Sequence, residues 1–329
     1  MIAAAVFLWL AGQKKEAQQQ AASHPVSQPI LYTAEFTFLN QPAVFEVSGP
    51  DAESFLEEIS SDLQKLDQEW SSSQPESILR QIQNDAGIQP TSLTDSQYAL
   101  IEQAFELVSQ SDGSYALTVA PLSALWEKGE PAPNEIGSAL SLIDDSQVLL
   151  DADAQTIFLP RPGYAIEMEP FVCGFAAKEI LAKCQTQEIE GIRASFGNIQ
   201  ISVGQSPDGI PNNLEITGSD SSVLASVSNE TRAAVIESGP VFDLSTGYPA
   251  ETEIQSAIVF CEDPVYAEWA AKLLFCGKMT PEQASADGQN CDILLIYSNG
   301  EITATDKLQD KILKPSDFST QNNTEGEND

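Results

Sequence analysis

The sequence predicts a fold of the α+β or mixed α/β class. Stretches with the apolar period of amphipathic helices occur along the chain, separated by short apolar or alternating segments bounded by turn residues. The two kinds of signal alternate irregularly, and no internal repeat or low-complexity linker interrupts residues 30–312. We therefore expect one compact domain, built from mixed sheets with packed helices and divided into two halves.

Four helices are expected. The best defined begins at Thr94 or Asp95, either of which can cap its first turn, and it ends at Asp112-Gly113. Its apolar face carries Tyr98, Ile101, Phe105 and Val108. The other three helices are expected over residues 51–67, 173–184 and 264–276.

Strand signals are shorter. A hairpin is predicted over residues 148–159, turning at Asp151-Ala152-Asp153, and a second over residues 293–302, turning at Asn299-Gly300. Residues 256–261 form a short apolar segment that predicts a further strand.

Composition excludes several function classes. The chain has 329 residues, enough to bury a sizeable core, with 49 acidic against 15 basic residues and a formal charge of −34. Phosphate contacts need a basic surface, so we expect no nucleic-acid partner. The same charge disfavours electrostatic docking onto anionic lipid.

Histidine and cysteine usage narrows the chemistry further. The single histidine, His24, precedes the first expected strand, which excludes Ser-His-Asp triads, Cys-His dyads and His-rich zinc sites in the domain. The five cysteines include no C-x-x-C pair, and we expect buried structural thiols. A disulfide in an oxidising compartment is the alternative, and it would leave at least one cysteine unpaired. Adjacent acidic residues such as Asp144 and Asp145 are expected to be solvated.

Both ends of the chain differ from its body. Residues 1–12 are apolar and uncharged, too short to span a membrane but as long as the apolar region of a signal peptide. Leu10-Ala11-Gly12 resembles the start of a bacterial lipobox, with Gln13 where the lipidated cysteine would stand. We expect residues 1–23 to be a signal peptide or membrane tether, with a frayed terminus of a cytoplasmic protein as the alternative. The main domain is expected over residues 24–312, and a disordered acidic tail over 313–329.

No nucleotide-binding loop of the G-x-x-x-x-G-K-[ST] or G-x-G-x-x-G type is present. Residues 111–126, SDGSYALTVAPLSALW, instead resemble a segment of the FAD:protein FMN transferases, the ApbE family. Further blocks follow in that family's order. They are IEMEPFVCGFAAKEIL (166–181), SFGNIQISVG (195–204), ASVSNETR (225–232), VFDLSTGYP (241–249) and AEWAAKLLFCG (267–277).

The resemblance implies transfer of FMN from FAD to a Thr or Ser hydroxyl of a target flavoprotein, with Mg²⁺, at the periplasmic or extracytoplasmic face of a bacterial inner membrane. It implies catalytic roles for Asp243 and Thr246, and Glu268 as a metal ligand. The implied contacts to the flavin nucleotide come from Thr118, Gly174, Gly197, Asn198, Ser228, Arg232 and Gly247. Turn formation by these glycines, and capping or surface roles for the polar residues, are the alternative.

The chain departs from the family pattern at several positions. The family's metal-binding Asp and Thr fall on Ala267 and Ala271, or, one residue later, on Glu268 and Lys272. Its histidine before the D-P pair falls on Pro240. Two hypotheses follow: an exported FMN transferase with a divergent site, or a catalytically degenerate member that serves as a flavin-binding or flavoprotein-interacting accessory module.

Overall fold

A computed structural model describes residues 30–206, 212–217, 223–228, 231–286 and 289–313. The expected signal peptide or tether (1–23) lies outside the described residues, as does the expected tail beyond residue 313. None of the described helices has both the length and the apolar character needed to cross a membrane.

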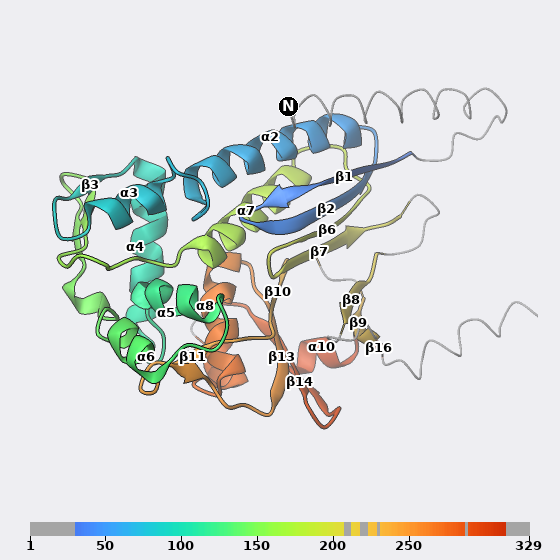
Figure 1. The fold of residues 1–329 in the computed structure, drawn as a ribbon. Helices are drawn as coiled ribbons and strands as arrows, with labels where there is room; N and C mark the ends of the chain where they lie inside the picture. The colour runs from blue at the N-terminus through green and yellow to red at the C-terminus, as the bar shows by residue number, and fades with distance from the viewer. Residues whose placement is uncertain (1–29, 207–211, 218–222, 229–230, 287–288, 314–329) are drawn as a thin grey trace, which may run out of the picture.

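The fold is centred on an eight-stranded antiparallel sheet (Figure 1). The N-terminal hairpin forms one edge, and the C-terminal hairpin forms the other. The strands, in spatial order, are β1 (Leu31–Phe38), β2 (Gln41–Ser48), β6 (Gly191–Phe196), β7 (Ile199–Gly204), β10 (Ala234–Glu237), β13 (Ile254–Phe260), β14 (Asp292–Tyr297) and β15 (Ile302–Ala304).

Helices cover one face of this sheet. They are α2 (Ala52–Trp70), α7 (Glu169–Cys184) and α8 (Pro264–Phe275), and α4 (Asp95–Ser109) packs on α7 and α8 from outside. Shorter elements lie on the same side of the sheet as these helices. They are α3 (Ile78–Asp85), α5 (Ala120–Trp126), α6 (Pro133–Leu140), the sheet of β3 (Thr91–Ser92), β5 (Thr156–Phe158) and β4 (Leu149–Asp151), and the pair β11 (Phe242–Asp243) and β12 (Tyr248–Pro249).

The central strands bury both faces. Val235, Val259 and Leu295 point into the core beneath the helices, whereas their neighbours Ile258 and Leu294 point into a second, smaller core. Successive side chains of a strand face opposite sides, so these strands read as continuous apolar runs. The second core is closed by β8 (Leu214–Thr217), β9 (Val223–Val227), β16 (Ile312–Leu313) and α10 (Asp306–Gln309).

The predicted elements are confirmed, with small shifts at their ends. Thr94 caps α4 in a reciprocal capping box with Gln97. The helix expected from Cys173 begins earlier, at Glu169, because Pro170 lies in its first turn, where a missing N–H costs nothing. Both predicted hairpins form, as β4–β5 and β14–β15, and the 256–261 strand is β13.

The cysteine expectation needs a correction. Cys261 and Cys291 form a disulfide, because they follow and precede the directly paired residues Phe260 and Asp292 of β13 and β14. Cys173, Cys184 and Cys276 are free thiols. Cys173 is buried, as expected, and burial raises its pKa well above the ordinary value.

Candidate functional site

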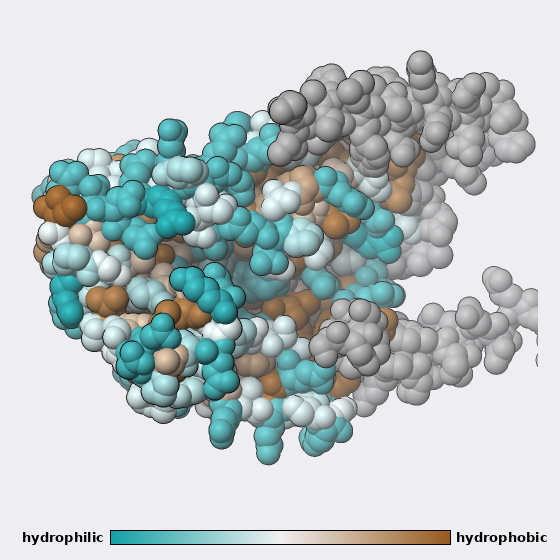
Figure 2. Space-filling model, in the orientation of Figure 1, coloured by the Kyte–Doolittle hydropathy of each residue, from teal (hydrophilic) through white to brown (hydrophobic). Residues whose placement is uncertain are grey.

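A cleft of about 590 Å³ opens between the helical layer and the ends of the central strands. Most of the visible face of the molecule is hydrophilic, and apolar residues gather around the hollow near its centre (Figure 2). The lining comes from α5, the start of α7, the β6–β7 turn, β10 with the loop after it, and α8. Segments distant in sequence therefore meet at this cleft.

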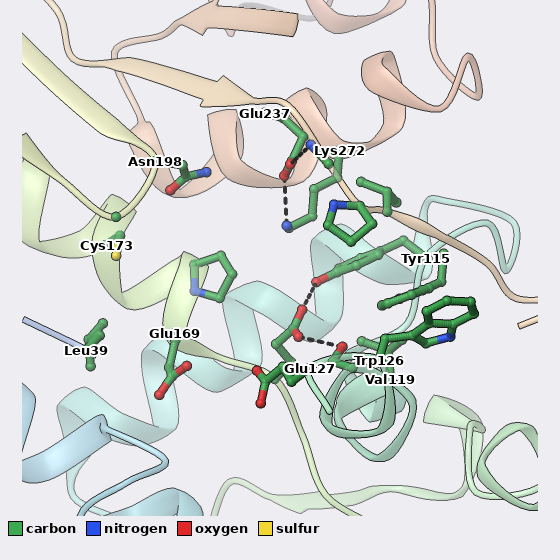
Figure 3. Close-up of a pocket in the computed structure, with 18 of the residues that line it drawn as sticks. Leu39, Tyr115, Val119, Trp126, Glu127, Glu169, Cys173, Asn198, Glu237 and Lys272 are labelled. Carbon is green, nitrogen blue, oxygen red and sulfur yellow. Dashed lines mark hydrogen bonds and ion pairs between the residues drawn. The ribbon is translucent and has the colours of Figure 1, made fainter. Parts of the chain in front are cut away.

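An ion pair between Lys272 of α8 and Glu237 of β10 occupies the cleft wall (Figure 3). Lys272 Nζ lies 2.9 Å from Glu237 Oε2, and the two side chains are only 12% and 10% exposed. Burial would lower the pKa of Lys272, but Glu237, followed by Tyr115, Glu167 and Glu268, raises it well above the usual value. Burial would likewise raise the pKa of Glu237, but Lys272 and backbone N–H groups bring it below its ordinary value. Both groups are therefore charged at neutral pH.

A second hydrogen-bonded group lies beside this pair. The hydroxyl of Tyr115 donates to Glu167 Oε2 at 3.0 Å, and the hydroxyl of Ser123 donates to Oε1 at 2.9 Å. Burial, followed by the charge of Glu167, raises the pKa of Tyr115 well above its usual value, so the phenol keeps its proton. The Lys272 ammonium lies 5.8 Å from the centre of the Tyr115 ring, within cation–π range.

Glu268, the expected metal ligand, lies one turn before Lys272 on α8 and is completely buried. Its Oε2 accepts a hydrogen bond from Asn198 Nδ2 at 2.7 Å, whereas Oε1 has no hydrogen-bond partner among the described residues. Burial, opposed by Lys272 and Asn198, raises the pKa of Glu268 to about 8. At pH 7 this carboxyl is predominantly protonated and neutral.

Aromatic side chains form the opposite end of the cleft. The Trp126 ring stacks on Phe242 with centroids 6.1 Å apart and meets Tyr248 edge-on at 5.7 Å. Its Nε1 donates to the carbonyl of Gly247 at 2.9 Å, which fixes α5 against the β11–β12 turn. Trp126 is half-buried and is held in place by Phe242 and Tyr248, so its ring is preorganised to contact an aromatic ligand.

Two of the expected cofactor contacts, Gly197 and Asn198, line the cleft at the β6–β7 turn. Gly197 has a φ of +55°, and a Cβ there would lie 2.8 Å from the sulfur of Cys173, so both the turn and the close approach require glycine. Asn198 directs its amide toward Glu268.

The expected catalytic residues lie in the β11–β12 turn. Asp243 accepts from the backbone N–H of Ser245 at 2.8 Å and from its hydroxyl at 2.6 Å, and the hydroxyl bond, followed by the backbone bond, lowers the pKa of Asp243. Thr246 is exposed, and Gly247 supplies the positive φ of the turn. The neighbours Phe242 and Leu244 line the cleft, while Asp243 and Thr246 themselves do not.

Thr118 and Gly174 make contacts within the fold. The Thr118 hydroxyl donates to Asp145 Oδ1 at 2.6 Å, and the same carboxylate accepts the backbone N–H groups of Leu117 and Thr118. The expectation of a solvated Asp145 is therefore wrong, because its carboxylate accepts the backbone N–H groups at the start of the 3₁₀ helix Leu117–Val119. A Cβ at Gly174 would lie 2.7 Å from the carbonyl oxygen of Pro264, so glycine allows α7 and α8 to approach closely.

Arg232 and Ser228 lie away from the cleft. Arg232 Nη2 forms a 2.7 Å ion pair with Asp292, and Nη1 donates to the carbonyls of Phe260 and Asn290. Ser228 donates to the carbonyl of Lys311. Among the described residues that line the cleft, Lys272 is the single cation, beside the carboxylates of Glu127, Glu167, Glu169 and Glu237.

These side chains do not fit a Mg²⁺ ion. Within the described ranges, no three His, Cys, Asp or Glu side chains are grouped so that they could hold a metal. Glu237, the ionised carboxylate on this wall, is already paired with an ammonium, and Glu268 is neutral at pH 7. Mg²⁺ prefers ionised oxygen ligands in near-octahedral geometry, and an adjacent ammonium repels it.

Comparisons with known proteins agree with this fold. The model of the ApbE family matches residues 33–295. FAD:protein FMN transferases of Klebsiella pneumoniae (strain 342) and Treponema pallidum (strain Nichols) are 22% and 23% identical over 247 and 297 residues. The alignments cover 69% and 78% of this chain and 77% and 81% of those proteins.

Solved structures of ApbE proteins share this fold. The ApbE protein of Thermotoga maritima superimposes with a TM-score of 0.73 at 18% identity, covering 86% of this chain and 99% of that one. The flavin transferase ApbE of Vibrio cholerae gives 0.70 at 16% identity, covering 89% and 99%. The α+β fold is thus the one these proteins share, and the chain belongs to the ApbE family.

Proposed function

We propose that this chain is a catalytically degenerate member of the ApbE family that binds the ring system of a flavin in its cleft, without a metal and without transferring FMN. Its relatives are named FAD:protein FMN transferases, which supplies the ligand class. The observation that carries the proposal is the Lys272–Glu237 ion pair, because it places an already neutralised cation where the cleft would need to neutralise phosphate.

Phosphoryl transfer requires positive charge around the diphosphate. Four carboxylates and one lysine line the cleft, and that lysine is paired. A phosphate charge about 6 Å from one carboxylate is disfavoured by roughly 0.7–3 kcal/mol, for an effective dielectric constant of about 80 down to 20. Several such carboxylates together oppose a diphosphate far more strongly than one.

A flavin ring meets a different environment. Trp126 and Phe242 supply aromatic lining to the cleft, and Val119 and Pro240 add apolar lining. Tyr115 and Ser123 hold Glu167 in place, so the polar groups facing the ring are fixed before a ligand arrives. Preorganised aromatic and polar groups of this kind favour a neutral heteroaromatic ligand over a polyanion.

Calorimetric titration of the full chain with riboflavin, FMN and FAD, in Mg²⁺ and then in EDTA, tests this proposal. We expect the uncharged riboflavin to bind more tightly than FAD, with no response to EDTA. Tight, Mg²⁺-dependent FAD binding with release of AMP would refute it. A Trp126→Ala variant should lose riboflavin binding, whereas Trp269→Ala, in the core, would alter stability and serves only as a folding control.

One observation favours the alternative of an active transferase with a divergent site. The chain matches 99% of the length of the solved flavin transferases, and the β11–β12 turn that carries Asp243 and Thr246 adjoins the cleft. Incubation with FAD, Mg²⁺ and an acceptor flavoprotein, followed by in-gel flavin fluorescence, distinguishes the two. Covalent flavin that disappears in Asp243→Ala would establish the transferase.

An extracytoplasmic location is a further proposal, supported by the Cys261–Cys291 disulfide. Disulfides persist in oxidising compartments and are rare in the cytosol. Thiol counting on protein isolated without reductant should find three reactive groups after denaturation, from Cys173, Cys184 and Cys276. Five free thiols would contradict this location.

A further inference from the structure

We infer that the ammonium of Lys272 replaces a bound metal ion in this cleft, so that the protein carries its cation covalently. The inference does not depend on whether the cleft holds a flavin. It concerns the oxygen atoms that surround Lys272 and the positive charge that they require.

Carboxyl groups from several segments act on the charge of the Lys272 ammonium, and Glu237 is the one in direct contact with it. Glu237 of β10 contacts it directly, Glu268 lies one helical turn away on the same face of α8, and Glu167 lies beyond the Tyr115 ring. Carboxylate oxygens are also the ligands that hard divalent cations prefer. The chain thus presents a set of cation-binding groups with a side-chain cation among them.

One of these carboxyl groups, that of Glu268, has an oxygen atom without a partner among the described residues. Its Oε2 is engaged by Asn198, but the fully buried Oε1 has no partner among the described residues. Buried polar atoms are nearly always satisfied, so an orphaned carboxyl oxygen beside an ion pair indicates a position that could take another ligand. Lys272 Nζ hydrogen-bonds to Glu237, and Glu268 Oε1 has no partner among the described residues, so the ammonium leaves that oxygen unsatisfied in the observed arrangement.

Glu237 shows that a cation is necessary. Its side chain is 10% exposed, and its hydrogen bonds from backbone N–H groups, such as that of Gly239 to Oε1 at 2.9 Å, carry no full positive charge, which leaves Lys272 to balance the carboxylate. A buried carboxylate without a counter-ion is strongly disfavoured. Removing the ammonium therefore leaves the carboxyl groups of Glu237 and Glu268 and the volume that the ammonium filled. An added divalent cation can then restore the charge balance.

The test uses MnCl₂ and the full chain without flavin. Wild type and Lys272→Ser are titrated with Mn²⁺ and followed by electron paramagnetic resonance and thermal unfolding. The control Lys278→Ser removes an exposed lysine a few residues further on, and so reports Mn²⁺ held by the acidic surface. We expect Lys272→Ser to bind one Mn²⁺ about tenfold or more tightly than wild type and the control do, with a matching Mn²⁺-dependent rise in Tm.

A second variant shows where the ion binds. Glu237→Gln combined with Lys272→Ser should lose the added Mn²⁺ site, because the ionised ligand is gone. The inference is overturned if folded Lys272→Ser binds Mn²⁺ no better than Lys278→Ser. It is also overturned, whether or not that variant folds, if wild type binds one Mn²⁺ tightly and Glu237→Gln abolishes this binding.

Discussion

Replacing Lys272 with methionine is expected to destabilise the protein strongly, because it removes the counter-ion of a buried carboxylate while keeping most of the unbranched apolar stem of the side chain. Glu237 would retain hydrogen bonds from backbone N–H groups, including that of Gly239, but no counter-ion. Breaking a buried pair from one side costs about 3–5 kcal/mol. In the variant, protonation of Glu237 would remove the uncompensated buried charge.

Protonation limits the loss and makes it depend on pH. Holding a proton at pH 7 on a glutamate with an unfolded-state pKa of about 4.3 costs about 3.7 kcal/mol, and this limit falls by about 1.4 kcal/mol per pH unit. In wild type the depressed pKa of Glu237 contributes stability that is present above the unfolded-state pKa and is lost as the pH falls through the folded-state value. The difference between wild type and variant should therefore shrink from pH 7 toward pH 5.

Urea unfolding at pH 5, 6 and 7 measures this difference. The matched control is Lys183→Met on α7, whose lysine pairs with the partly exposed Glu58 and Asp62, and which we expect to cost about 1 kcal/mol or less. Adding Glu237→Gln to Lys272→Met should recover stability at pH 7. The reasoning is refuted if Lys272→Met costs no more than Lys183→Met, or if its effect is the same at every pH.

Three other predictions follow from the contacts described. Arg232→Ala should lower the free energy of unfolding by about 3–5 kcal/mol, since it leaves the buried Asp292 carboxylate with the Thr305 hydroxyl but without its counter-ion. Calorimetry should show unchanged flavin binding in this variant. The control Arg193→Ala, from an exposed pair, should cost less than about 1 kcal/mol. Glu268→Gln should remove part of the pH dependence of the free energy of unfolding. In wild type, burial raises the pKa of Glu268 to about 8, so the protein becomes less stable as the pH rises from the unfolded-state pKa toward 8. Urea unfolding at pH 5–8 should therefore give a flatter stability profile for the variant than for wild type, and an identical profile would show that Glu268 ionises freely. Reducing the Cys261–Cys291 disulfide, which closes a 30-residue separation, should lower the free energy of unfolding by about 3.6 kcal/mol in urea unfolding. The double serine variant should not respond to reductant, and an equal loss in that variant would point to another thiol.

Local signals predicted the elements that local interactions stabilise. The Thr94–Gln97 capping box and the Asn299-Gly300 turn, with Gly300 at φ +84°, are both visible in the sequence and present in the structure. The hairpin β1–β2 could not be found this way. Its turn places Leu39 and Asn40 at positive φ, and the Leu39 N–H is held by the distant carboxylate of Asp67. Tertiary contact here overrides a weak turn sequence.

The cleft was only partly predictable for the same reason. Gly197 and Asn198 could be named from the sequence because the block that contains them, SFGNIQISVG, resembles a segment of the family, and both line the cleft. Glu237 and Lys272 lie 35 residues apart and meet only because α8 packs on β10. Arg232 has the right chemistry for phosphate, but its partner Asp292 is 60 residues away, and no local pattern reveals that pairing.

The pairing of β2 with β6 also determines how the protein can fold. The central sheet becomes continuous only when Ser48 meets Gly191, after all of α2 to α7 has been traversed. Closing a loop of that length costs about 4 kcal/mol of chain entropy, so the N-terminal hairpin and the helices should form before the sheet is completed. During synthesis, the β1–β2 hairpin emerges long before β6, so the edge of β2 that pairs with β6 stays unpaired until then. A chaperone that shields this edge would protect the nascent chain from pairing with its neighbours.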